Sequence, residues 1–126
     1  MPSSVLNVSV DCADPYELCR FWSEVTGKPI PEEDQPGHDE VGFQLNDDTA
    51  LLFLRVPEPK TVKNRLHLCL QPDIPRDEEI SRILALGATL VNDLRNPDGT
   101  GWAVLADPEG NEFCVLRSAA ERAATS

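Results

Sequence analysis

The chain has 126 residues, of which 40% are hydrophobic and 26% are charged, as is ordinary for one soluble globular domain. With 11 basic and 22 acidic residues its net charge is −11, which opposes binding to nucleic acid or to an anionic membrane. No apolar stretch approaches the ~20 residues of a membrane span, and the first residues lack the features of a secretory signal, so we expect a cytoplasmic protein.

The first half of the chain predicts a strand, a helix and further strands. Apolar and polar residues alternate over 5–11, which is typical of a half-buried strand. Asp14 is a suitable N-cap and Pro15 a suitable first residue for a helix that ends at Gly27. The acidic, breaker-rich segment 31–40 is expected to be a loop. Further strands are expected at 42–45 and 50–56, with a short one starting at 28–30.

The second half repeats this order after a linker at 57–64, which contains two prolines and two lysines. Pro75 begins the second helix and Gly87 ends it. The tail, 118–126, is expected to be frayed or to form a short helix. Strands are expected at 65–71, 88–91, 102–106 and 112–116. One domain, 1–126, would thus contain module one (1–56), the linker, module two (65–117) and the tail.

The two modules form an internal repeat. Gly27 and Gly87 are separated by 60 positions, and the same shift places Pro15 on Pro75. The repeat consists of the order of elements and the residues that end them, because identity between the halves is very low.

Two βαβββ modules in a short chain resemble the vicinal oxygen chelate superfamily, which includes glyoxalase, bleomycin-resistance and extradiol-dioxygenase proteins. The chain looks most similar to bacterial glyoxalase-like domain proteins, through the stretches DCADPYELCRFWSEVTG, RVPEPKTVKNRLHLCL and GWAVLADPEGNEFCVL. The resemblance implies an α+β fold in which two βαβββ modules form a curved, open eight-stranded barrel-like sheet with helices outside. It also implies a small-molecule ligand on the concave face and a homodimer.

The resemblance further implies a metal site with one ligand position on each of four strands. Those positions are Asn7, Leu51, His67 and Glu112, and only His67 and Glu112 are ordinary metal ligands. The site is therefore half missing, and glyoxalase I activity is not expected. A bound metal would be one divalent ion (Zn, Ni, Mn, Fe or Co) at His67 and Glu112. The alternatives are a hydrogen-bonded His67–Glu112 pair, or Glu112 as a catalytic general base whose proton affinity His67 shifts.

Strand alternation and side-chain chemistry select the candidate ligand-binding residues. Arg65 suits a carboxylate or phosphate on the ligand. Phe53 and Trp102 are candidates for an apolar pocket wall, with core packing as the alternative. Cys69 and Cys114 are expected on the same ligand-facing side, with small-residue packing as the alternative. The full set is Asn7, Phe53, Arg65, Cys69, Trp102 and Cys114.

We therefore expect a protein that holds an amphipathic small molecule in its concave sheet, with an anionic group on that molecule if Arg65 contacts it. The alternative is a metal-dependent lyase, isomerase or oxygenase that uses His67 and Glu112, so enzyme status stays open. The four cysteines form no CxxC pair and are expected to be free thiols in a reducing compartment.

Overall fold

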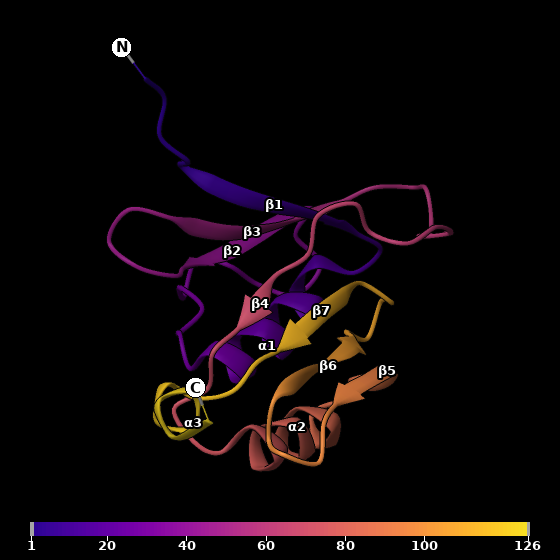
Figure 1. The fold of residues 1–126 in the computed structure, drawn as a ribbon. Helices are drawn as coiled ribbons and strands as arrows, with labels where there is room; N and C mark the ends of the chain where they lie inside the picture. Colours follow the sequence, from indigo (N-terminus) through magenta and orange to yellow (C-terminus); the bar gives the residue numbers. More distant parts are fainter. Residues whose placement is uncertain (1, 126) are drawn as a thin grey trace. The chain divides into compact units, whose positions relative to one another are not determined.

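The computed structural model describes residues 2–125 and divides into two compact units, with the boundary between Lys60 and Thr61. In this described part the fold is α+β, with three helices and two mixed sheets of three and four strands (Figure 1). The elements are β1 (Asn7–Cys12), α1 (Pro15–Thr26), β2 (Glu40–Gln44), β3 (Ala50–Arg55), β4 (Cys69–Leu70), α2 (Arg76–Ala85), β5 (Thr89–Arg95), β6 (Gly101–Ala106), β7 (Glu112–Val115) and α3 (Ala119–Thr125).

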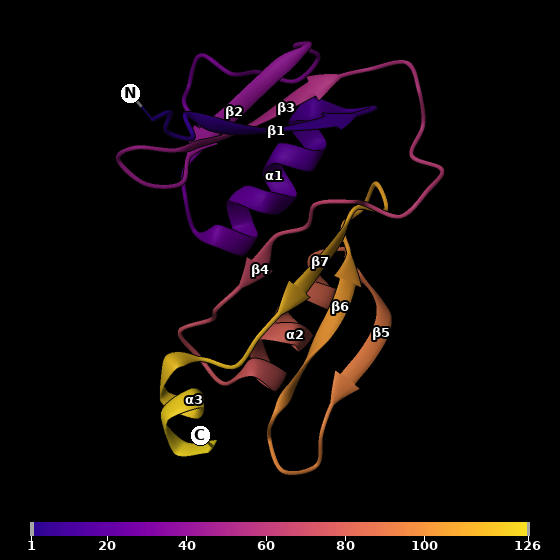
Figure 2. The same ribbon diagram turned by 45° about the horizontal axis from the view of Figure 1, so that its top comes forward.

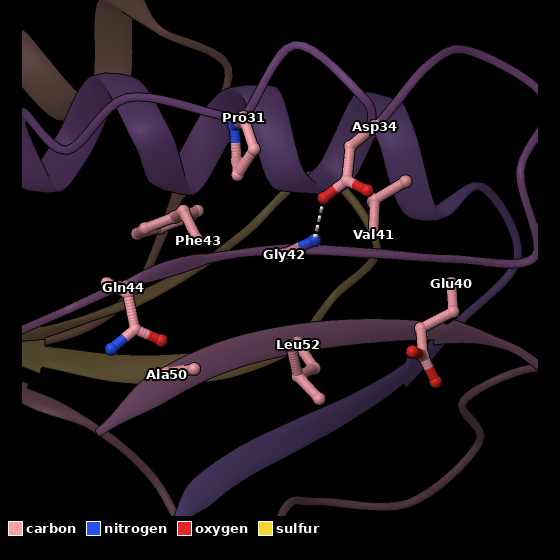
Figure 3. Close-up of a pocket in the computed structure, with 9 residues that line it drawn as sticks. All are labelled: Pro31, Asp34, Glu40, Val41, Gly42, Phe43, Gln44, Ala50 and Leu52. Carbon is pink, nitrogen blue, oxygen red and sulfur yellow. Dashed lines mark hydrogen bonds between the residues drawn. The ribbon is translucent and has the colours of Figure 1, made fainter. Parts of the chain in front are cut away.

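The first unit packs α1 against one face of a sheet with the strand order β1-β3-β2 (Figure 2). Strand β1 is parallel to β3, and β2 is antiparallel to it. The register pairs Phe53 with both Val10 and Val41, so these three side chains point to the same face. Val41 lies on the side of the sheet that faces the helix (Figure 3). The core of this unit therefore lies between α1 and this side of the sheet.

Helix α1 begins and ends where the sequence predicts. Asp14 accepts a hydrogen bond from the backbone N–H of Glu17 at 3.4 Å, and Pro15 is the first helical residue. Gly27 ends the helix with φ 72°, in the left-handed region that favours glycine. The local capping signals alone account for both helix ends.

The second unit packs α2 against a sheet with the order β4-β7-β6-β5. Strand β4 is parallel to β7, and the other pairs are antiparallel. The tail forms the short helix α3, where Ser118 Oγ accepts from the N–H of Glu121 and Glu121 Oε1 accepts from the N–H of Ser118. The buried side chains between α2 and the sheet include Ile80, Ile83, Leu105, Phe113 and Val115.

Two expectations about strands are wrong, and side-chain hydrogen bonds explain both. No strand forms at 28–30, and the edge of β2 is instead met by Asp34, whose Oδ2 accepts from the N–H of Gly42 at 3.0 Å (Figure 3). The strand expected at 65–71 is reduced to Cys69–Leu70. Before β4, two hydrogen bonds to Glu112 of β7 take the place of a regular ladder. The backbone N–H of Asn64 donates to the Glu112 carboxylate, and the Asn64 side-chain amide donates to the Glu112 backbone carbonyl. The described part therefore has seven strands rather than eight, and neither sheet closes into a barrel.

For Phe53 of β3 the structure supports core packing, the alternative to a pocket wall. Phe53 shares the helix-facing side of the sheet with Val10 and Val41 and is 0% exposed. Its ring stacks on Phe43, with ring centroids 6.3 Å apart and 28° between the planes. The same side holds Leu51, also 0% exposed, so the opposite face of β3 carries Ala50 and the residues that alternate with it.

Along residues 2–125, no helix has the length and apolar character needed to cross a membrane.

Candidate functional site

The candidate site lies on the face of the second sheet that points away from α2, called here the open face. Phe113 and Val115 of β7 are buried toward the helix side, so Glu112 and Cys114 point to the open face. The register then places neighbours beside Cys114 on both adjoining strands. The open face is defined by Cys69, Leu94, Trp102, Val104, Glu112 and Cys114.

A cluster of one imidazole and two thiols occupies this face at the β4 end. His67, Cys69 and Cys114 each place one ligand atom within 4.8 Å of the others. His67 and Cys69 are exposed, whereas Cys114 is buried. Burial raises the pKa of the Cys114 thiol, the neighbouring Cys69 raises it further, and Lys63 offsets part of this effect. In the metal-free state Cys114 is therefore a protonated thiol at neutral pH.

Backbone hydrogen bonds fix the two thiols beside each other. The N–H of Cys114 donates to the carbonyl of Leu68 at 2.9 Å, and the N–H of Leu116 donates to the carbonyl of Leu70 at 2.9 Å. These bonds belong to a parallel ladder in which Cys69 and Cys114 are direct partners. His67 stands two residues before Cys69, the spacing that puts side chains on one face of an extended chain.

Glu112 is not part of this cluster, although the sequence analysis paired it with His67. Its Oε1 accepts a hydrogen bond from the backbone N–H of Asn64 at 3.1 Å. The side-chain amide of Asn64 also donates to the backbone carbonyl of Glu112 at 3.2 Å. Sequence reasoning did not single out Asn64, because nothing local marks a partner 48 positions away. This carboxylate holds the segment before β4 against β7.

The remaining predicted ligand-binding residues lie in four different environments. Trp102 is 42% exposed on the open face, where its register partner Leu94 is 39% exposed. Arg65 is exposed in the irregular segment before β4. Asn7 is exposed on β1, beside Ala50 in the first unit's sheet. Phe53 lies in the core and does not line the face expected for it.

A pocket of about 210 Å³ that the sequence analysis did not predict lies along β2, one of the two edge strands of the first sheet (Figure 3). Asp34 holds one side of it through its hydrogen bond to Gly42. A Cβ on Gly42 would come within 2.5 Å of Leu52 Cδ2 and 2.6 Å of the carbonyl oxygen of Leu51, so glycine is required here. The pocket is lined by Pro31, Asp34, Glu40, Val41, Gly42, Phe43, Gln44, Ala50 and Leu52.

Comparison with known families now identifies the fold. The model of a family described as a glyoxalase-like domain matches residues 7–116, which span both units. The chain belongs to the glyoxalase-like domain family. Solved structures of glyoxalase/bleomycin resistance/dioxygenase type share its fold. No curated protein matches the chain by sequence.

Three solved structures illustrate how broadly this glyoxalase-like fold is used. A glyoxalase/bleomycin resistance protein/dioxygenase family enzyme from Burkholderia phytofirmans has a TM-score of 0.68 at 20% identity, covering 90% of this chain and 97% of its own. The fosfomycin resistance protein FosX from Listeria monocytogenes, complexed with Mn(II) and a dihydroxypropylphosphonic acid, has 0.69 at 17%, covering 97% and 95%. Lactoylglutathione lyase from Agrobacterium tumefaciens has 0.61 at 22%, covering 91% and 93%. The TM-scores establish the shared fold, and identities this low carry no conclusion about activity.

The four residues that the resemblance suggests as metal ligands do not together fit a metal in this glyoxalase-like domain. Leu51 has a hydrocarbon side chain and is 0% exposed in the core of the first unit. Asn7 offers only an amide, and the carboxylate of Glu112 already accepts from Asn64. Among these four residues, His67 is therefore the one common metal-ligand type whose side chain is not already used in the contact between Asn64 and Glu112. A chelate of the superfamily type therefore lacks its donor set.

Proposed function

We propose that this glyoxalase-like domain binds an amphipathic small molecule on the open face of the second sheet, without glyoxalase I chemistry. The observation that carries the proposal is the apolar surface formed by Trp102 and Leu94, which are 42% and 39% exposed on adjacent strands. Exposed indole rings on a sheet face offer a large apolar contact area to a ligand. Arg65 supplies a cation for an anionic group on that ligand.

Several finer expectations belong to this proposal. In it, Asn7 of β1 stays a predicted ligand-binding residue, and the protein is a homodimer. Cys69 and Cys114 contact the ligand from the floor of the open face. The proposed location is the cytoplasm, and the four free cysteines support a reducing compartment.

The test uses anilinonaphthalene sulfonate, an amphipathic anion, as the probe ligand. Binding is followed by the rise in fluorescence of the probe itself, so that the readout is kept in a variant that lacks Trp102, whose side chain is 42% exposed. We expect Trp102→Ala to weaken probe binding at least about tenfold, because a large apolar contact is removed. Arg65→Ala should weaken it about threefold, the size typical of an exposed ion pair.

Two matched variants serve as controls for this titration. Leu90→Ala removes a 45% exposed leucine from the opposite side of the same sheet, because Leu90 pairs with the buried Leu105. Arg122→Ala removes an exposed cation from α3. Both should bind the probe as the unmodified protein does. Equal weakening in Leu90→Ala and Trp102→Ala, with an unchanged melting temperature, would contradict the proposed face.

The alternative function is a metal-dependent lyase, isomerase or oxygenase at His67 and Glu112. The Mn(II) complex of the FosX neighbour favours it at the level of the fold. The contacts of Glu112 with Asn64 argue against it, since they assign this carboxylate to holding the chain before β4. Glu112 as a general base therefore stays a secondary prediction, and we derive no reaction step through a metal at this pair.

A further inference from the structure

We propose that His67, Cys69 and Cys114 form a binding site for a thiophilic metal ion of the Zn²⁺ class. The three ligand atoms lie within 4.8 Å of one another on the open face of the second sheet. This site shares His67 with the four positions that the resemblance implies, but its other two ligands are the thiols of Cys69 and Cys114. It shares Cys69 and Cys114 with the small-molecule proposal above but does not rest on it, and either proposal can fail without the other.

The three ligand atoms need to move only slightly closer together to bind one metal ion. Zinc binds sulfur at ~2.3 Å and imidazole nitrogen at ~2.0–2.1 Å, so ligand atoms of a tetrahedral site lie roughly 3.5–3.8 Å apart. The observed separations of up to 4.8 Å exceed this by about an ångström. Cys69 and Cys114 are held by the β4–β7 ladder, whereas His67 lies in the irregular segment before β4 and is exposed. A change in the His67 side chain and its local backbone supplies the closure.

The donor set selects the class of metal. Thiolate sulfur prefers Zn²⁺, Cd²⁺ and similar ions, while Mg²⁺ and Ca²⁺ require oxygen ligands. On binding, the metal displaces the protons of both thiols to solvent, and the two thiolates balance the charge of the ion. The net charge of −11 adds a field that attracts a cation.

The site has an accessible fourth position. Three protein ligands and one open position are the arrangement that binds a water or another ligand atom. His67 and Cys69 are exposed, so solvent reaches the ion from the open face. Trp102 and Leu94 belong to this face, but the metal site itself needs neither of them.

The test is a titration of the full-length, reduced protein with Co²⁺, which reports its ligands by absorption. We expect one Co²⁺ per chain, a thiolate-to-cobalt charge-transfer band, intense visible bands of a tetrahedral ion, and displacement by Zn²⁺ but not by Mg²⁺. Cys69→Ser should lose the charge-transfer band or most of it, and His67→Ala should lose the one-to-one complex. Cys12→Ser removes a thiol from the first unit and should leave the spectrum unchanged.

A second measurement avoids substitutions that disturb folding. Alkylation of Cys69 by iodoacetamide in the unmodified protein should be blocked by saturating Zn²⁺ and unaffected by Mg²⁺. Absence of a charge-transfer band in the fully reduced protein, or a band that survives in both Cys69→Ser and His67→Ala, would overturn the proposal. So would alkylation of Cys69 at the same rate with and without Zn²⁺.

Discussion

At the scale of single residues, the four cysteines differ sharply in environment although the sequence gives each the same chemistry. Cys69 is exposed, and Cys12, Cys19 and Cys114 are buried. Burial raises the pKa of the Cys19 thiol to about 12, and the nearby Asp34 and Cys12 add to the effect. Since the thiolate is the nucleophile, burial and a raised pKa both suppress reaction.

We therefore predict that iodoacetamide modifies one thiol rapidly in the native, reduced, metal-free protein at about pH 8, where an ordinary thiol is partly ionised. Intact-mass measurement over time should show a single fast addition, and peptide mapping should place it on Cys69. The fast phase should vanish in Cys69→Ser and persist in Cys12→Ser. A fast addition at Cys19 would contradict the assigned environment.

At the scale of elements, charged side chains link the edge strand β5 to helix α2. Arg95 donates to Asp93 on its own strand at 2.8 Å and to Asp77 of α2 at 3.1 Å. The hydrogen bonds from Arg95 hold the pKa of Asp93 at about 2, below the ordinary value of 3.8. Since these carboxylates accept from one guanidinium, their protonation weakens both contacts.

This network predicts the direction of acid sensitivity. Because the pKa of Asp93 is lower in the folded than in the unfolded state, its pairing stabilises the fold above about pH 4 and this contribution is lost as the pH falls toward about 2. Urea unfolding across this window should show a smaller loss of stability in Asp93→Asn than in the unmodified protein. Asp73→Asn, an exposed aspartate before α2, should retain the full pH dependence. Identical slopes in Asp93→Asn and the unmodified protein would refute the assignment.

At the scale of the whole molecule, both compact units belong to one family match, which covers residues 7–116. The homodimer implied by the resemblance stays a prediction. Within its own sheet β1 is an edge strand, and the exposed apolar residues Leu6 and Val8 lie at it, with Leu6 75% exposed. Edge strands with apolar side chains are common sites of association.

Light scattering should therefore give a mass of about twice 13.9 kDa for the unmodified protein. Leu6→Asp should shift the equilibrium toward the single chain, because a charge is placed at this edge. Val62→Asp is the matched control, since Val62 is also 75% exposed but lies outside the strands. A single-chain mass for the unmodified protein at all concentrations would contradict the predicted dimer.

The sequence by itself determined the features that depend on near neighbours. Asp14, Pro15 and Gly27 specify both ends of α1 because capping bonds span only a few residues. The order of helices and strands follows from periodicity, and so does the common face of His67 and Cys69, two residues apart. The two-module pattern was also sufficient to suggest the family that the comparison confirms.

Only the tertiary structure decided which face each strand presents and which distant residues meet. Alternation separates Phe53 from Leu52 but gives no direction, and pairing with β1 and β2 turned Phe53 into the core. Likewise, Cys114 meets Cys69 only because β4 and β7 pair in this register. The hydrogen bond from Asn64 to Glu112 spans 48 positions, and it gives a structural role to a carboxylate that the sequence analysis expected to bind a metal. Such contacts depend on strand register, which is a property of two segments together and is encoded in neither alone.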